Sequence, residues 1–289
     1  MTAGPMPADE IERHRHAVQA VRDRREASLR DPTGWLSLVG LHWLATGIWR
    51  FGSDPTGEIV LNAHDGAVPP IAGTLEVADG TVRVHPQPRV ELTVDGEGVA
   101  DGLVLVDDRE GEPTILELAS LRLYLIRRGE ERLALRAKDV SAPTLRSFAG
   151  LDYYPIDSCW RVTARLLPAA SGATIRVPDV VGDVVADATP GDVLFELGGA
   201  SHRLHALEAQ PGHLWLIFGD TTNGRETYGA GRFLVSGPVQ PDDTVEIDFN
   251  LAYNPPCVFS PFATCPLPPE GNRLAMPVEA GERMWSSHG

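Results

Sequence analysis

The amino-acid sequence predicts a mainly β protein, folded as an antiparallel sandwich and/or barrel, with one N-terminal helix. Asp-Gly turns stand between several short apolar runs, at Asp79-Gly80, Asp95-Gly96 and Asp101-Gly102. An Asx-Gly pair between alternating apolar runs is a strong hairpin signal. Helical periodicity nearly disappears after residue 30, and successive strands without intervening helices indicate antiparallel sheets.

The N-terminal helix is predicted over residues 9–29. Sparse apolar positions, including Val18 and Val21, lie among Glu, Arg and His residues, which is typical of an exposed helix with a narrow apolar stripe. We expect Asp9 to be the N-cap of this helix, and Pro32 lies just beyond its end.

The rest of the chain is predicted to be two β-rich regions. Residues 1–30 form a tail and the helix, 31–145 the first β-rich region, and 146–289 the second, which carries the candidate site. The two regions form either one compact unit or two domains. Residues 35–51 are predicted as two short strands, or a strand and a turn. Further strands are predicted at 81–84, 90–94, 103–106, 114–118, 121–126, 132–136, 160–167, 174–178, 193–197, 202–208, 214–218, 231–235 and 244–249.

Composition excludes several classes of partner. The chain has 289 residues, of which 43% are hydrophobic and 22% charged, and its net charge is −15. A surface this acidic repels phosphate backbones and anionic membranes, so we expect no nucleic-acid or membrane partner. The N-terminus lacks the apolar core of a secretory signal, and three cysteines do not make a disulfide framework. We therefore expect a cytoplasmic protein. Its oligomeric state is left open.

The first candidate segment is residues 218–234. An apolar strand ends at Phe218, and a polar turn beginning at Asp220 leads to Tyr228 and Arg232 among several glycines. Such a hairpin tip could line the mouth of a ligand pocket. It could equally be an ordinary hairpin built from turn-forming residues. No P-loop pattern is present.

The second candidate segment is residues 248–282. Asp248 and Asn250 are two residues apart, so on a strand they share one face. Asn254 precedes Pro255-Pro256, which hold its backbone extended. A rigid loop of this kind either seals one end of a barrel or forms the wall of a ligand site.

Cys257 and Cys265 lie in the same segment, with seven residues between them. They are packed thiols, a disulfide or redox pair, or residues with a metal-binding or nucleophilic role. Neither CxxC nor HxxxH accompanies them, so no metal site is predicted.

The chain resembles a widespread bacterial family known only as unknown-function domain family 1684. The resemblance extends over nearly the whole chain and rests above all on the C-terminal segment; Cys159 does not belong to the shared motif. It implies a bacterial origin and gives weight to the C-terminal segment, but it implies no activity. The motifs that carry it are Gly-Leu-x-Trp-Leu within 35–47, Tyr154-Pro-Ile-Asp157, residues 227–234, Asp248-Phe-Asn250, Tyr253-Asn-Pro-Pro-Cys257, Cys265-Pro266, Asn272-Arg-Leu274 and Ala280-Gly-Glu282.

Two hypotheses for function follow. In the first, the protein binds a small molecule, anionic or uncharged, in a β-barrel or sandwich pocket, with or without catalysis, and no cofactor is identified. In the second, it is a non-catalytic structural or interaction protein, and the C-terminal Asn/Pro/Cys motif is a folding signature. For the first hypothesis, the candidate catalytic residues are Asp220, Asp248 and Cys257, the ligand-binding residues are Tyr228, Arg232, Asn250 and Asn254, and the redox or structural pair is Cys257 and Cys265.

Overall fold

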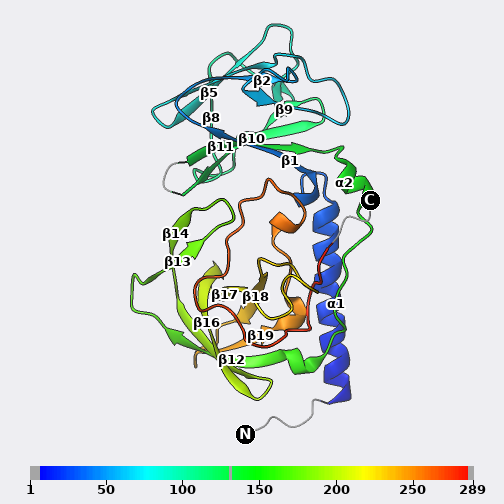
Figure 1. The fold of residues 1–289 in the computed structure, drawn as a ribbon, viewed down its shortest axis with the longest axis vertical. Helices are drawn as coiled ribbons and strands as arrows, with labels where there is room; N and C mark the ends of the chain where they lie inside the picture. The colour runs from blue at the N-terminus through cyan, green and yellow to red at the C-terminus, as the bar shows by residue number, and fades with distance from the viewer. Residues whose placement is uncertain (1–6, 130–131, 286–289) are drawn as a thin grey trace. The chain divides into compact units, whose positions relative to one another are not determined.

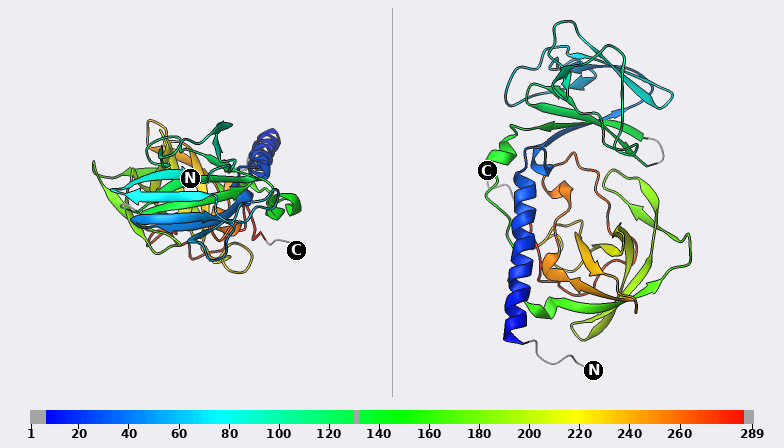
Figure 2. Two further views of the ribbon diagram at one scale, coloured as in Figure 1. Left: turned by 90° about the horizontal axis from the view of Figure 1, so that it is seen from above. Right: turned by 180° about the vertical axis from the view of Figure 1, so that it is seen from behind.

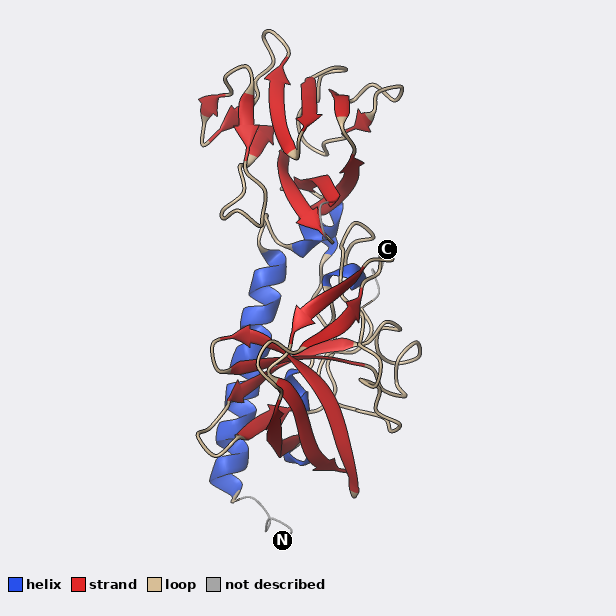
Figure 3. Cartoon of the chain, turned by 90° about the vertical axis from the view of Figure 1, so that its left-hand side faces the viewer, coloured by secondary structure: helices blue, strands red, loops and turns tan. Residues whose placement is uncertain are grey.

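The computed structural model describes residues 7–129 and 132–285. The described residues divide into two compact units. Unit 1 comprises residues 7–27, 149–258 and 264–285, and unit 2 comprises 28–129, 132–148 and 259–263. Strands dominate both units (Figures 1 and 3), which confirms the predicted mainly β class. No helix in the described ranges is long and apolar enough to cross a membrane.

The N-terminal helix, α1, spans Ala8–Arg30 and runs alongside the strands of unit 1 (Figure 2). The Pro7 carbonyl accepts hydrogen bonds from the backbone N–H groups of Glu10 and Ile11, both at 3.0 Å. Pro7 therefore has the position of the N-cap, and the prediction that Asp9 caps the helix is wrong. Asp9 lies in the first turn, where its carboxylate pairs with Arg13 at 2.9 Å.

Unit 2 consists of two sheets around one apolar core. Leu75 and Val84 from one sheet and Leu123 and Leu135 from the other belong to a single buried cluster, as in a β-sandwich. A 3₁₀ turn (η1, Trp35–Ser37) and a short helix (α2, Pro143–Ser147) flank the strands. The strands of the first sheet, in order, are β1 (Leu38–Leu44), β11 (Arg132–Asp139), β10 (Leu121–Arg128), β9 (Leu116–Leu118), β6 (Thr93–Val94) and β7 (Glu97–Gly98). The strands of the second sheet, in order, are β3 (Ile59–Val60), β2 (Gly47–Gly52), β4 (Gly73–Ala78), β5 (Thr81–Pro86) and β8 (Leu103–Leu105).

Unit 1 is built on a six-stranded antiparallel sheet. Its edge strands β18 and β19 contact each other, so the sheet curls into a nearly closed barrel around Phe218, Leu234 and Phe249. A separate hairpin joins β13 (Thr174–Pro178) to β14 (Val184–Ala188). In sheet order the strands are β18 (Arg232–Pro238), β17 (His213–Phe218), β16 (Ala200–Gln210), β15 (Gly191–Leu197), β12 (Arg161–Pro168) and β19 (Thr244–Asp248); the 3₁₀ turns are η2 (Ser158–Trp160), η3 (Phe249–Leu251) and η4 (Pro256–Val258).

The structure corrects the predicted strands in several places, and β3, β4, β7 and β14 were not predicted at all. The strand predicted at 90–94 shrinks to β6, because Val90 N–H turns back to the Gln87 carbonyl at 3.2 Å. The prediction that Asp248 and Asn250 share the face of one strand is also wrong. β19 ends at Asp248, whose carboxylate accepts a hydrogen bond from the Asn250 N–H and starts η3.

The C-terminal segment of unit 1 has little regular structure. Isolated β-bridges tie it to distant parts of the unit, joining Gly219 to Arg273 and Tyr153 to Glu282. Three of its polar residues, Asn254, Asn272 and Glu282, are buried.

Candidate functional site

Arg232, the first residue of β18, is fully buried with its charge partner. Its Nη2 donates to Asp220 Oδ2 at 2.9 Å and to the Val278 carbonyl at 2.8 Å. Its Nη1 donates to the carbonyls of Ala280 and Glu282. The sequence predicts Arg232 as a ligand-binding residue and Asp220 as a catalytic residue; in the structure each is the charge partner of the other.

Two asparagines bind the backbone as a neighbouring strand would. The Asn250 side chain accepts from Asp157 N–H at 3.1 Å and donates to the Asp157 carbonyl at 2.8 Å. Asn272 makes the same two bonds with His205, at 2.8 and 2.9 Å. Sequence reasoning did not single out Asn272 as a site residue, although it lies in the motif Asn272-Arg-Leu274.

Asn254 joins the C-terminal segment to α1. Its backbone N–H donates to Glu282 Oε2 at 2.7 Å, and its side chain donates to the Arg283 carbonyl at 2.8 Å. Arg25 on α1 donates to Glu282 Oε1 at 3.0 Å and to the Asn254 carbonyl at 2.8 Å. Burial raises the pKa of Glu282 above its usual value, although Arg25 opposes this shift.

Tyr228, Cys257 and Cys265 form a second cluster, called here the thiol cluster. The backbone N–H of Cys257 lies 3.1 Å from Cys265 Sγ, and the two thiol groups are hydrogen-bonded to each other. The Tyr228 hydroxyl bonds to the Cys257 thiol. The bonds from Cys265 and Tyr228 outweigh burial and lower the pKa of Cys257 to about 7.

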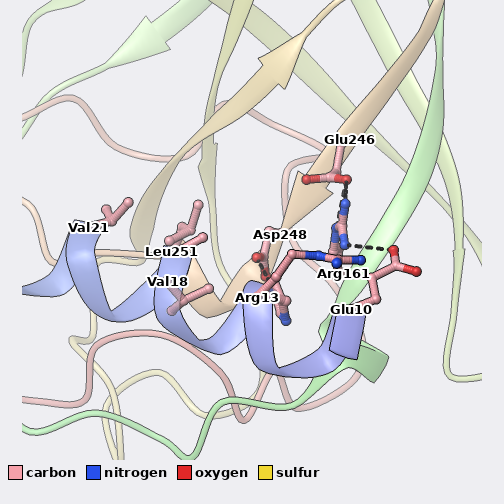
Figure 4. A pocket seen from close by; sticks show the side chains of 10 residues that line it. Glu10, Arg13, Val18, Val21, Arg161, Glu246, Asp248 and Leu251 are labelled. Atoms are coloured by element: carbon pink, nitrogen blue, oxygen red, sulfur yellow. Dashed lines mark hydrogen bonds and ion pairs between the residues drawn. The ribbon is translucent and has the colours of Figure 1, made fainter. Parts of the chain in front are cut away.

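A cavity of about 390 Å³ lies between α1 and the strands β12 and β19, and is called here the α1 groove (Figure 4). One end is apolar, and the other gathers two arginines and two glutamates, with Asp248 between the ends. Its lining residues are Glu10, Arg13, His14, Ala17, Val18, Val21, Arg161, Glu246, Asp248 and Leu251.

His14 and Asp248 form a buried pair at the centre of the α1 groove. His14 Nε2 lies 2.6 Å from Asp248 Oδ2, and each side chain is 6% exposed. Asp248 Oδ1 accepts from the backbone and side-chain nitrogens of Asn250, at 3.0 and 2.8 Å. Asn250 therefore holds the carboxylate in place, and the carboxylate in turn orients the imidazole ring.

Both arginines of the α1 groove already have carboxylate partners. Arg13 pairs with Asp9, and both side chains are more than two-thirds exposed. Arg161 donates to Glu246 at 2.7 Å, while Glu10 lies 3.6 Å away. An ion pair as exposed as Arg13–Asp9 contributes about 0–1 kcal/mol, so a ligand carboxylate can compete for the Arg13 guanidinium. Arg161 is 27% exposed and also pairs with Glu246 through Nη2, so it is the more firmly held of the two arginines.

The predicted site residues thus fall into three places. Asp248 lines the α1 groove and is hydrogen-bonded to Asn250. Asp220 and Arg232 form an ion pair in the core, and Asn254 is hydrogen-bonded to Glu282 and Arg283. Tyr228, Cys257 and Cys265 form the thiol cluster. Sequence reasoning missed His14, which stands 234 positions before Asp248. Among residues 7–129 and 132–285, no three His, Cys, Asp or Glu side chains are grouped to hold a metal ion.

The chain was compared with known proteins. Residues 146–283 match the model of a family described as "Protein of unknown function (DUF1684)". This match is shorter than the resemblance drawn from the motifs, which extended to residues 35–47. The solution NMR structure of an uncharacterized protein of Haloarcula marismortui is 34% identical and is matched over 49% of this chain and 80% of that one, with a TM-score of 0.41. No curated protein matches the chain.

Proposed function

The chain belongs to the DUF1684 family, whose function is unknown, and we propose that it binds a small amphiphilic carboxylate in the α1 groove. One observation carries the proposal: the apolar end and the arginine end of the groove meet at the His14–Asp248 pair. This arrangement suits a ligand with an apolar body and a charged head.

The size and lining of the groove support such a ligand. A volume of about 390 Å³ lies within the range of small-molecule sites, roughly 300–1,000 Å³. Val18, Val21 and Leu251 offer an apolar wall at one end. At the other end, Arg13 and Arg161 present planar guanidinium groups, which suit bidentate binding of a carboxylate.

His14 lines the groove between its two ends, with Asp248 holding one nitrogen of the ring. When Nε2–H donates to Asp248, the neutral ring carries its lone pair on Nδ1. A carboxylate that fixes the tautomer of a histidine is a recurring arrangement in sites that transfer protons.

Calorimetric titration with decanoate tests the proposal, and decanol serves as the uncharged control ligand. We expect decanoate to bind and decanol to bind far more weakly. Arg161→Ala should weaken decanoate binding by roughly ten-fold to a hundred-fold, the effect of one charge-assisted contact. Arg165→Ala, which removes an exposed arginine on the same strand outside the groove, should leave binding unchanged.

An NMR titration localises the ligand. The ring signals of His14 should shift when decanoate is added, whereas those of His202, which stacks on Phe195 in the barrel, should not. The proposal fails if decanoate does not bind to the wild-type protein, or if Arg161→Ala and Arg165→Ala bind it equally well.

A second proposal concerns the C-terminal motif, whose Asn and Arg side chains we infer stabilise the fold. Arg232, Asn250, Asn254 and Asn272 are each at most 1% exposed. Their side chains bond to backbone groups or to Asp220 and Asp248 within unit 1. This supports the folding-signature hypothesis for these residues, and the stability of the variant Arg232→Ala tests it.

A further inference from the structure

The thiol cluster lies outside the α1 groove and takes no part in the binding proposed there. Cys265 is 4% exposed, whereas Cys257 is only partly buried. Cys257 lies in η4, directly after Pro255-Pro256, and Cys265 directly precedes Pro266. Prolines restrict the backbone on both sides, so the loop presents the two sulfurs to each other at low entropic cost.

We propose that Cys257 and Cys265 form a reversible dithiol–disulfide pair that reduces small disulfides, with Cys257 as the attacking thiol and Cys265 as the resolving thiol. The assignment of roles follows from exposure. A small disulfide can reach the partly exposed Cys257, whereas the buried Cys265 has the Cys257 thiol as its hydrogen-bonded neighbour.

The reaction balances in two exchange steps. The Cys257 thiolate attacks one sulfur of the disulfide R–S–S–R, forming a mixed disulfide on Cys257 and releasing one R–S⁻. Cys265, as its thiolate, then attacks Cys257 Sγ, forming the Cys257–Cys265 disulfide and releasing the second R–S⁻. The protons of the two protein thiols end on the two released thiols, and two electrons pass from the protein to the substrate.

The Tyr228 hydroxyl and the Cys265 thiol favour the reactive form of Cys257. Burial and the bond to Cys257 raise the pKa of Tyr228, so the phenol stays protonated and donates to the sulfur. The pKa of Cys257, about 7, places a large share of the thiolate at neutral pH, close to the optimum for an attacking thiol. Cys159 is the internal contrast, because desolvation and the neighbouring Asp157 raise its pKa to about 11.

The test uses the full chain and glutathione disulfide as the probe. After incubation, the protein is unfolded in acidic denaturant, free thiols are alkylated, and each cysteine peptide is quantified by mass spectrometry. We expect Cys257 and Cys265 to lose alkylation together while Cys159 keeps it, with both halves of the probe released as glutathione. Dithiothreitol should restore both thiols.

Three variants separate the two roles. In Cys265→Ser the reaction should stop at the first step, so that glutathione stays attached to Cys257. In Cys257→Ser neither step should occur, and Cys265 should stay alkylatable. The matched control, Cys159→Ser, should behave as the wild type. The proposal is overturned if Cys257 and Cys265 remain alkylatable in glutathione disulfide, or if Cys265→Ser accumulates no mixed disulfide on Cys257.

The pH dependence of alkylation tests the part played by Tyr228. The rate at Cys257 should rise with a midpoint near pH 7, and Tyr228→Phe should move this midpoint upward by removing one donor to the thiolate. A midpoint for Cys257 that coincides with that of Cys159 would contradict the assignment of Cys257 as the attacking thiol. Because no step involves the α1 groove, failure of this test and failure of decanoate binding are distinguishable.

Discussion

At the scale of single residues, the energetics of unit 1 centre on buried charges that need a partner. Arg232 and Asp220 have fully buried side chains 2.9 Å apart. Removing one partner of such a pair leaves an uncompensated charge in a medium of low polarity, which is far more costly than loss of a surface ion pair. Comparing the loss of stability when a buried pair and an exposed pair are broken therefore measures how much burial adds to the cost of an unpaired charge.

We expect Arg232→Ala to lower the free energy of unfolding of unit 1 by about 3–5 kcal/mol, because it leaves the buried Asp220 carboxylate without its charge partner. Urea unfolding gives this value. The matched control is Arg203→Ala, which breaks a pair with Asp192 in which the arginine is 61% exposed and should cost about 0–1 kcal/mol. Equal losses in the two variants would contradict a structural role for Arg232.

At the scale of elements, the hairpin between β17 and β18 depends on a close backbone approach at Gly231. Its φ of 100° lies in the region that favours glycine, and a Cβ there would stand 2.6 Å from the Phe218 carbonyl oxygen. Gly224, in the same connection, also has positive φ, but a Cβ there would meet open space. An alanine at Gly224 therefore adds backbone strain alone, whereas an alanine at Gly231 adds both strain and a steric clash.

Gly224→Ala should cost about 1–2 kcal/mol from backbone strain alone. Gly231→Ala should lower the free energy of unfolding by about 1–3 kcal/mol more than Gly224→Ala, because the steric clash adds to the strain. Chemical denaturation of both variants measures the difference. If the two alanine variants are equally stable, β18 can shift to accept the side chain, and the close approach does not constrain the hairpin.

Asp139, at the end of β11, organises the neighbouring loops of unit 2. Its carboxylate is fully buried and accepts from His64 N–H at 2.8 Å and from Ser141 N–H at 2.9 Å. Burial raises its pKa, but the hydrogen bonds from Ser120, Ser141 and His64 outweigh burial and lower the pKa below 3.8. The carboxylate therefore stabilises the folded state above pH 3.8, and this contribution is lost as pH falls through the lowered value.

Asp139→Asn should cost about 1–3 kcal/mol at neutral pH, because it removes hydrogen bonds to a charged acceptor. The difference in unfolding free energy between the variant and the wild type should decrease as pH falls below 3.8. Calorimetric melting across this range gives the pH profile, and Glu91→Gln, an exposed change in the same unit, should follow the wild type throughout. A gap that does not change with pH would show that the charge of Asp139 is not what stabilises the loops.

At the scale of the whole molecule, the chain builds two separate hydrophobic cores. One is buried between the two sheets of unit 2, and the other fills the barrel of unit 1. Separate cores lose their packing independently, so unfolding need not be a single cooperative transition.

We expect calorimetry to resolve two transitions. Leu123→Ala on β10 should shift one transition to lower temperature, and Leu216→Ala on β17 should shift the other. Each substitution should lower the free energy of unfolding of its own unit by about 2–5 kcal/mol. The substitutions are matched, since both leucines are 0% exposed in the middle of a strand. A single transition that both variants shift equally would mean that the two cores unfold as one.

Sequence by itself was sufficient for features that neighbouring residues determine. The helix over residues 8–30 and most strands follow from apolar spacing and from turn chemistry, which act over a few positions. β4 was missed although Leu75 and Val77 alternate with polar residues, so the signal was present. Asn250 and Cys257 lie in a C-terminal segment whose unusual composition marked it before any partner was known.

Tertiary structure alone decided what those residues contact. His14 meets Asp248 across 234 positions, Arg25 meets Glu282 across 257, and Asn272 pairs with the backbone of His205. The sequence marked Arg232 as a ligand-binding residue, and only folding placed Asp220 and three carbonyls around it. Local propensities are properties of short segments, whereas these contacts depend on how the barrel closes and where the C-terminal segment crosses it.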